Sequence, residues 1–171
     1  MSAPDILEDL KPFFDKEITE TDQVAVDQLA DIFERDMIDV TIPMGDITLV
    51  VKRHKYSKAD KDGLPEYFNG YYERFIHIIT RTENGTRGFD SKRANRIHWI
   101  KPILENSEDP RITCFAFVEA NGAVRNYYWY RAKMYMVIVE NIDVECTLIT
   151  GFCVDPKHKD YYQHKYTNRI K

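Results

Sequence analysis

Four strand-like segments follow one another in the last third of the chain, and they leave few architectures open. Residues 111–120 alternate apolar with polar side chains, the Asn-Gly pair that follows is a strong hairpin signal, and residues 123–131 form the returning strand. Residues 134–140 and 145–154 continue the meander. Because short connections favour neighbouring antiparallel strands, the sequence predicts a four-stranded antiparallel meander.

The N-terminal part favours helices instead. Apolar residues recur at helical spacing within residues 5–16, which predicts a first helix. Thr21 or Asp22 is a suitable cap for a second helix that ends near Phe33. Residues 47–51 form a short β-branched segment after a Pro-Met-Gly-Asp turn, so one further strand is expected there.

One helix is predicted before the meander and another after it. Asp90 or Ser91 caps a segment whose apolar residues keep helical spacing to Leu104, and Pro102 is expected to kink or end that helix. A final helix is expected to open at Pro156. The predicted fold class is therefore α+β, with N-terminal helices, a helix plus the meander, and a C-terminal helix.

A polar stretch at residues 53–66 is typical of a linker, because it contains Gly63 and Pro65 and few apolar side chains. It divides the chain into an acidic helical segment, residues 1–52, and a basic α+β domain, residues 67–171. Residues 67–80 hold a near-continuous apolar run, which periodicity alone assigns neither to a strand nor to a helix.

The charge is distributed unevenly along the chain. Residues 1–67 carry 8 Lys and Arg against 16 Asp and Glu, a net charge of −8. Residues 68–171 carry 16 against 12, a net charge of +4. The second part could therefore hold a polyanion such as RNA, and the acidic N-terminal helices could shield it or bind a protein inhibitor or other partner.

Several functional classes lack support in the sequence. Cys114, Cys146 and Cys153 form no CxxC pair, so they are interpreted as reduced and mostly buried. His158 and His164 are six residues apart on a helix with no partner motif, and a solvated tail helix explains them better than a metal site. Dinucleotide, P-loop and serine-hydrolase motifs are missing, so neither a metal nor a cofactor is predicted.

No stretch approaches the roughly 18 apolar residues of a membrane span, and no membrane partner is expected. The first ten residues lack the basic and apolar regions of a secretory signal. A cytoplasmic location is therefore expected.

A few residues fit the cleavage of RNA without a metal, which needs a base, an acid and cations around the phosphorus. His77 stands within an apolar run, and Arg81 would share its face if the segment is helical. Thr150 is a polar residue in an apolar strand. The alternatives are a histidine at the edge of the core and a threonine satisfied by the sheet.

Aromatic and basic side chains could contribute RNA contacts. On a strand, Tyr128 and Tyr130 share one face, while Tyr127 and Trp129 share the other. One face must pack the core, and the other could stack bases, although both faces could also be structural. A basic run could follow a phosphate backbone or could form a solvated face; its members are Arg87, Lys92, Arg93 and Arg96.

Taken in order, three segments resemble a known superfamily. Residues 75–81 read Phe-Ile-His-Ile-Ile-Thr-Arg, residues 93–104 read Arg-Ala-Asn-Arg-Ile-His-Trp-Ile-Lys-Pro-Ile-Leu, and residues 148–151 read Leu-Ile-Thr-Gly. Together with the meander, this order is similar to the barnase–EndoU–colicin–RelE-like (BECR) nucleases, particularly their phage- and toxin-associated branches. The resemblance covers about residues 67–154, and Thr82 stands where a second histidine is expected.

This resemblance implies a metal-independent endoribonuclease that cleaves tRNA or other RNA by attack of the 2′-hydroxyl. Carried over by position, it implies a catalytic set of His77, Arg81, Tyr130 or Lys133, and Thr150. It implies RNA contacts from the basic run and Tyr128.

Two other classes of function stay open. One is a non-catalytic interaction protein, such as an inhibitor, an immunity protein or a phage accessory protein. The other is an RNA-binding module without chemistry. A nuclease would gather His77, Arg81 and Thr150 in one concave cationic site, whereas an interaction module would scatter them.

Overall fold

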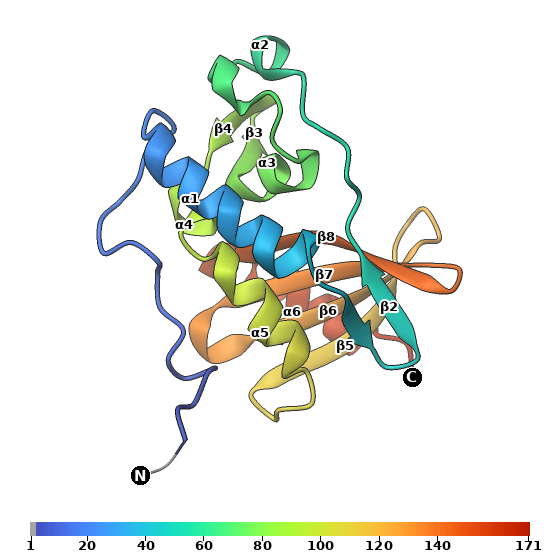
Figure 1. Cartoon of the computed structure of the whole chain (residues 1–171). Coiled ribbons are helices and arrows are strands. Elements are labelled where there is room, and N and C mark those ends of the chain that lie inside the picture. The colour runs from blue at the N-terminus through green and yellow to red at the C-terminus, as the bar shows by residue number, and fades with distance from the viewer. Residues whose placement is uncertain (1–2) are drawn as a thin grey trace.

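A mixed six-stranded sheet forms the centre of the computed structural model, which describes residues 3–171 (Figure 1). The strand order is β1-β2-β8-β7-β6-β5. The bounds of these strands are β1 Ile42–Met44, β2 Ile47–Val50, β5 Ile112–Val118, β6 Val124–Tyr130, β7 Tyr135–Ile142 and β8 Glu145–Cys153. A separate hairpin pairs β3, Thr80–Glu83, with β4, Thr86–Phe89.

The predicted meander is present as part of this larger sheet. Strands β5 to β8 pair antiparallel with their neighbours, and Gly122 has a φ of 86° in the turn between β5 and β6. Strand β2 adds to β8 in parallel and β1 pairs antiparallel with β2. The α+β class is therefore confirmed, whereas the sheet has more strands than the four that were expected.

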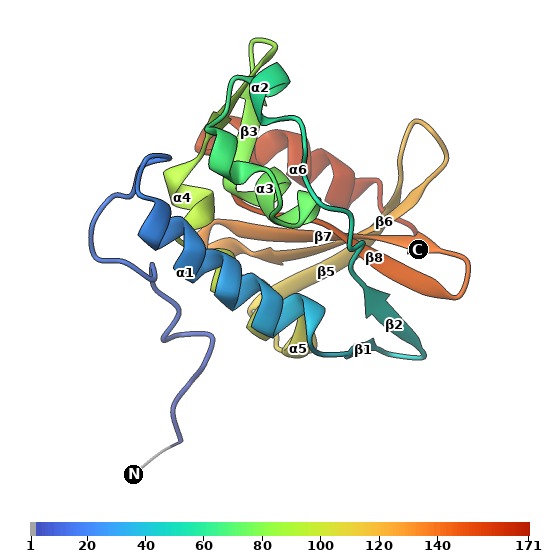
Figure 2. The ribbon, with the colours of Figure 1, turned by 45° about the horizontal axis from the view of Figure 1, so that its top comes forward.

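Helices cover both faces of the sheet (Figure 2). Their bounds are α1 Gln23–Phe33, α2 Ala59–Asp62, α3 Glu73–Ile79, α4 Ser91–Ala94, α5 Ile100–Glu105 and α6 Lys159–Thr167. On one face, Tyr162 and Tyr166 of α6 pack against aromatic residues of the sheet. On the other face, α1, α3 and α5 bury their apolar sides with Val137, Val139 and Leu148.

The helix predicted for residues 5–16 does not form. Residues 3–22 run as an irregular arm along the outside of α4 and α5, with short turns at residues 6–9 and 20–21 (Figure 1). Pro12 lies within the predicted helix and has no N–H for it. Side chains of the folded body bind the carbonyl groups of the arm instead, while Leu7 and Ile18 are buried in the core.

The helix predicted from residue 91 to Leu104 is interrupted. Helix α4 ends after Ala94 because Asn95 turns aside to pair with the arm: its side chain accepts from the N–H of Phe14 at 2.7 Å and donates to the Phe14 carbonyl at 2.9 Å. Pro102 lies in the first turn of α5, where its missing N–H has no helical partner to lose, so the helix continues past it to Glu105.

Residues from both sides of the predicted linker contribute to the same core. Leu29 of α1 and Leu49 of β2 belong to the buried cluster that also holds Ile76 of α3 and Leu148 of β8. The segment at 53–66 contains the short helix α2 and buries three of its own side chains, which are those of Tyr56, Ala59 and Leu64.

Gly151 of β8 occupies a position without room for a side chain. A Cβ atom there would stand 2.6 Å from the Tyr135 hydroxyl and 2.7 Å from Cγ1 of Ile100, two residues that are fully buried. We expect Gly151→Ala to lower the free energy of unfolding by about 1–3 kcal/mol because the core is overpacked. Chemical denaturation monitored by circular dichroism measures this change.

Gly88 of β4 provides the matched control, since a Cβ atom there meets nothing within 4 Å. Gly88→Ala should be neutral or stabilise by up to about 1 kcal/mol. Equal destabilisation by both substitutions would show that the backbone freedom of glycine, and not the close packing at Gly151, explains the effect of Gly151→Ala.

Candidate functional site: a groove around Arg93

A groove of about 320 Å³ lies between the β3–β4 hairpin, α4, the end of β8 and the start of α6. We call it the Arg93 groove. Its lining residues are Arg81, Asp90, Arg93, Arg125, Ile138, Ile149, Thr150, Phe152, Cys153, Asp155, His158 and Tyr162. The predicted residues Arg81, Arg93 and Thr150 therefore meet at one site, although they come from three separate segments of the chain.

The groove exists because β8 loses a neighbour halfway along its length. Strand β2 pairs only with residues 145–147 of β8, and the register between β7 and β8 shifts between Ile138 and Val139. Beyond that point arginine side chains reach the strand: Nη1 of Arg74 donates to the carbonyl of Ile149 at 2.8 Å. Guanidinium groups thus stand where a further strand would otherwise pair.

The guanidinium group of Arg93 is held in place by polar groups that carry no charge. Its Nη1 donates to the carbonyl of Thr80 at 2.9 Å, and its Nη2 donates to Oγ1 of Thr150 at 2.7 Å. Its backbone N–H donates to the Asp90 carboxylate, which caps α4. Among residues 3–171, no carboxylate lies within 4.0 Å of the guanidinium nitrogens.

The Nε atom of Arg93 is buried and has no hydrogen-bond partner in the described part of the chain. Burial lowers the pKa of the Arg93 guanidinium, but an arginine keeps its charge at any physiological pH.

Other charges in the groove balance one another in part. The side chain of Arg81 is 54% exposed and lies 3.2 Å from Glu83 and 3.7 Å from Asp90. Arg125 forms an ion pair of 2.8 Å with Glu140. Asp155 accepts from the N–H of Lys157, and this bond, together with the positive charge of Lys157, lowers its pKa.

Aromatic and thiol groups form the apolar part of the lining. The rings of Phe152 and Tyr162 lie 5.5 Å apart between centroids, and the Arg93 guanidinium lies 5.7 Å from the Phe152 ring. Burial raises the pKa of the Tyr162 hydroxyl and of the Cys153 thiol, so both stay protonated at neutral pH. These rings offer flat surfaces on which a base could stack.

His77 is not among the residues that line this groove. It lies on α3, its side chain is 32% exposed, and its Nε2 is 3.7 Å from the Glu73 carboxylate one turn earlier. Burial, followed by the charges of Arg87 and Arg74, lowers the pKa of His77, so its imidazole is neutral at neutral pH. Of the open segment 67–80, residues 73–79 thus form the helix α3, and His77 lies outside the lining of the Arg93 groove.

Tyr130 and Lys133 hold the N-terminal arm. Tyr130 is 1% exposed, and its hydroxyl donates to the Leu7 carbonyl. Nζ of Lys133 donates to the carbonyl groups of Glu8 and Leu10 at 2.7 and 2.8 Å. Neither of these two predicted catalytic residues lines the Arg93 groove, and the contacts described here tie both to the arm.

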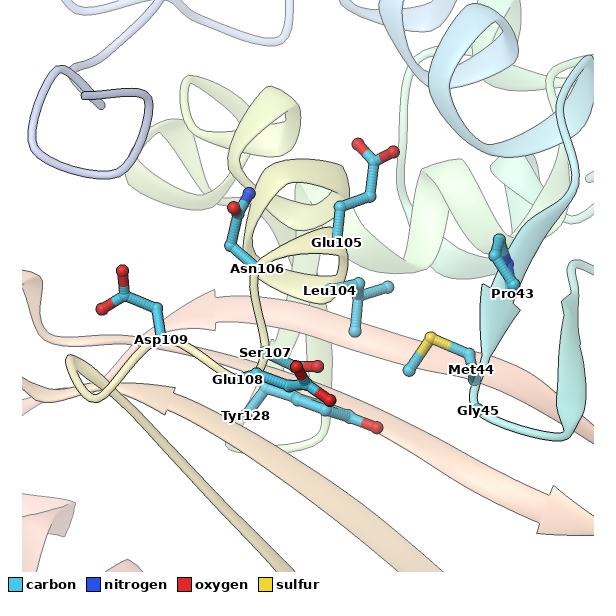
Figure 3. A pocket seen from close by; sticks show the side chains of 10 residues that line it. All are labelled: Pro43, Met44, Gly45, Leu104, Glu105, Asn106, Ser107, Glu108, Asp109 and Tyr128. Carbon is cyan, nitrogen blue, oxygen red and sulfur yellow. The ribbon is translucent and has the colours of Figure 1, made fainter. Parts of the chain in front are cut away.

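Tyr128 lines a different cavity of about 680 Å³ between the end of α5 and the β1–β2 turn (Figure 3). Glu105, Glu108 and Asp109 stand around it, and its described lining includes no lysine or arginine. Burial raises the pKa of the Tyr128 hydroxyl. This acidic setting disfavours the phosphate of an RNA and argues against the predicted RNA contact.

The predicted basic run divides in the structure, and Arg93 is its one member in the groove lining. Arg87 donates to Oγ1 of Thr80 and lies 3.9 Å from Asp62. Arg96 donates to the carbonyl of Lys92 and stands over the ring of Trp99. Lys92 is exposed on α4.

The sequence reasoning missed Asp155, His158 and Tyr162. His158 was interpreted as part of a solvated tail helix, because neither its spacing from His164 nor a partner motif indicated a site. A usable signal was the position of these residues directly after the strand that carries Thr150. Residues at the end of one strand and the start of the next helix lie at the same edge of a sheet.

Comparison of the chain with family models, curated proteins and solved structures found no match. Within residues 3–171, no group of three or more His, Cys, Asp or Glu side chains is placed to hold a metal ion. The same part of the chain has no helix with the length and apolar character needed to cross a membrane.

Proposed function

We propose that the protein is an endoribonuclease that binds and cleaves RNA in the Arg93 groove without needing a metal ion. One observation carries the proposal: Arg81, Arg93 and Thr150 converge there from β3, α4 and β8, and no carboxylate of the described residues lies within 4.0 Å of the guanidinium nitrogens of the half-buried Arg93. A phosphate diester is the anion that this arrangement would suit.

The groups of the groove match the needs of the reaction. The 2′-oxygen loses its proton and bonds to phosphorus, the bond from phosphorus to the 5′-oxygen breaks, and that oxygen takes up a proton. The products are a 2′,3′-cyclic phosphate and a 5′-hydroxyl, so the step balances without a co-reactant. Arg93 and Arg81 would stabilise the charge that builds up on the phosphoryl oxygens, and Thr150 would fix the Arg93 fork.

RNA is favoured over a small anion by the rest of the lining. Phe152 and Tyr162 supply aromatic surface beside the guanidinium groups, a combination suited to single-stranded nucleic acid. The groove lies in the part of the chain with a net charge of +4. The acidic N-terminal arm does not cover it, because none of residues 3–22 is among its lining residues.

The test is cleavage of total tRNA by the full chain in the presence of EDTA, resolved on denaturing gels. The wild type should cut, and Arg81→Ala and Thr150→Val should each slow cleavage by about tenfold, since each removes one hydrogen bond to or from a charged group. Arg81→Ala should also reduce the salt slope of RNA binding by about 0.7, the value for one contact to a single strand.

Lys52→Ala is the matched control, because Lys52 is an exposed cation outside the groove. It should leave the rate and the salt slope unchanged. RNA binding without cleavage by the wild type would assign the groove to an RNA-binding module. If the wild type neither binds nor cleaves, the groove has no RNA function, and an interaction protein that uses the acidic cavity of Figure 3 becomes the better candidate.

A further inference from the structure

His158 stands at the mouth of the Arg93 groove on a short, well-anchored turn. It is the last residue of the 3-10 turn Pro156–His158 and the cap of α6. Its backbone N–H donates to the Asp155 carbonyl at 2.8 Å, which fixes the turn, while its side chain is exposed and lines the groove. Asp155 and Arg81 line the same groove as His158.

Most groups that face His158 keep one protonation state near neutral pH. Arg81 of β3, Arg93 of α4 and Arg125 of β6 are permanent cations. Cys153 of β8 and Tyr162 of α6 stay protonated because burial raises the pKa of each.

The two carboxylates that line the groove with His158 already take part in hydrogen bonds and ion pairs. Asp155 accepts from the N–H of Lys157 and lies 3.8 Å from its Nζ, and its pKa is lowered. Asp90 accepts from the N–H of Arg93 and lies 3.7 Å from Nε of Arg81. Among the lining residues that the structure describes, an imidazole is present only at His158, and imidazole is the side chain suited to exchanging a proton near neutral pH.

We infer that His158 is the general base that takes the proton from the 2′-hydroxyl of an RNA bound in the Arg93 groove, an inference that rests on the proposed function. The 2′-oxygen then bonds to phosphorus, the bond to the 5′-oxygen breaks, and water protonates that oxygen. Arg93 and Arg81 hold the phosphoryl oxygens while the proton moves to His158. The sequence pattern instead favoured His77, whose side chain faces Glu73 outside the groove lining.

The assignment is tested by measuring kcat/KM for a short RNA between pH 5 and 8. The wild-type value should rise with pH as the base loses its proton. His158→Ala should lower kcat/KM by about a hundredfold or more and remove that rise. Added imidazole should restore part of the activity of His158→Ala, an effect that a purely structural role would not produce.

Two matched variants keep the result interpretable. His164→Ala removes another exposed histidine of α6 that lies outside the groove, and it should retain wild-type activity. His77→Ala should retain the pH dependence. Loss of the rise in His77→Ala, with His158→Ala unaffected, would overturn the assignment of His158 and leave the nuclease standing. Absence of cleavage by the wild type would overturn the nuclease and this inference together.

Discussion

Substitution of Lys165 by methionine is expected to lower the free energy of unfolding by about 3–5 kcal/mol. Lys165 is 7% exposed, and its Nζ uses all three protons, donating to both carboxylate oxygens of Glu119 at 2.7 and 3.0 Å and to the Tyr127 hydroxyl at 2.9 Å. Methionine keeps the length of the side chain but leaves the Glu119 carboxylate without its cation. Urea denaturation of both proteins at neutral pH measures the loss.

The double substitution Lys165→Met with Glu119→Gln tests the mechanism. It removes both charges, so it should cost clearly less than Lys165→Met alone. If the two variants are equally unstable, lost packing of the lysine stem is responsible and the ion pair contributes little.

The pH dependence of stability provides a second readout for this pair. Burial alone would raise the pKa of Glu119, but the hydrogen bonds from Lys165 and Tyr127 outweigh it, and the pKa is lowered. A carboxylate with a lowered pKa stabilises the fold above its unfolded pKa, and that contribution is lost as the pH falls through its folded pKa. Lys165→Met should therefore lose less stability on acidification than the wild type.

The C-terminal half shows what local sequence patterns can predict. Strands β5 to β8 lie where the four strand-like segments were predicted, and the Asn-Gly turn lies between β5 and β6 as expected. Helix α1 has Asp22 as its cap, with the carboxylate accepting from the N–H of Ala25. In these segments the local preference and the packing agree, and the prediction needed no long-range information.

The N-terminal arm shows where such patterns fail. The spacing of its apolar residues suits a helix, but the residues that bind its carbonyl groups stand about 90 to 125 positions later in the chain. No local window contains Trp99, Tyr130 or Lys133, so a periodicity argument cannot weigh their hydrogen bonds against helical ones.

The candidate site was predictable only in part for the same reason. The sequence indicated Arg81, Arg93 and Thr150 as separate candidates. The groove between them depends on the bulge in the β7–β8 pairing and on the short β2, and both features arise only when the sheet assembles. His158 carries no motif of its own. Its place beside Arg81 follows from the way β8 leads into α6, which becomes visible only after the strand order is known.

Leu7→Ala separates the structural role of the arm from the shielding role that the charge pattern suggested. Leu7 is 2% exposed, so its truncation should lower the free energy of unfolding by about 2–5 kcal/mol. Ile6→Ala is the matched control: its neighbouring side chain is 59% exposed, and the change should stay within about 0.5 kcal/mol. Thermal and urea denaturation of the three proteins measure both effects.

RNA affinity decides between the two roles. If the acidic arm shielded the cationic part, loosening it through Leu7→Ala would strengthen RNA binding and steepen its salt dependence. The structure argues against a gain in RNA affinity, because the arm is bound by Lys133 and Trp99 and contributes nothing to the lining of the Arg93 groove. We therefore expect Leu7→Ala to bind RNA as tightly as the wild type while it remains folded. A gain in affinity in that variant, with Ile6→Ala unchanged, would show that the arm guards the groove.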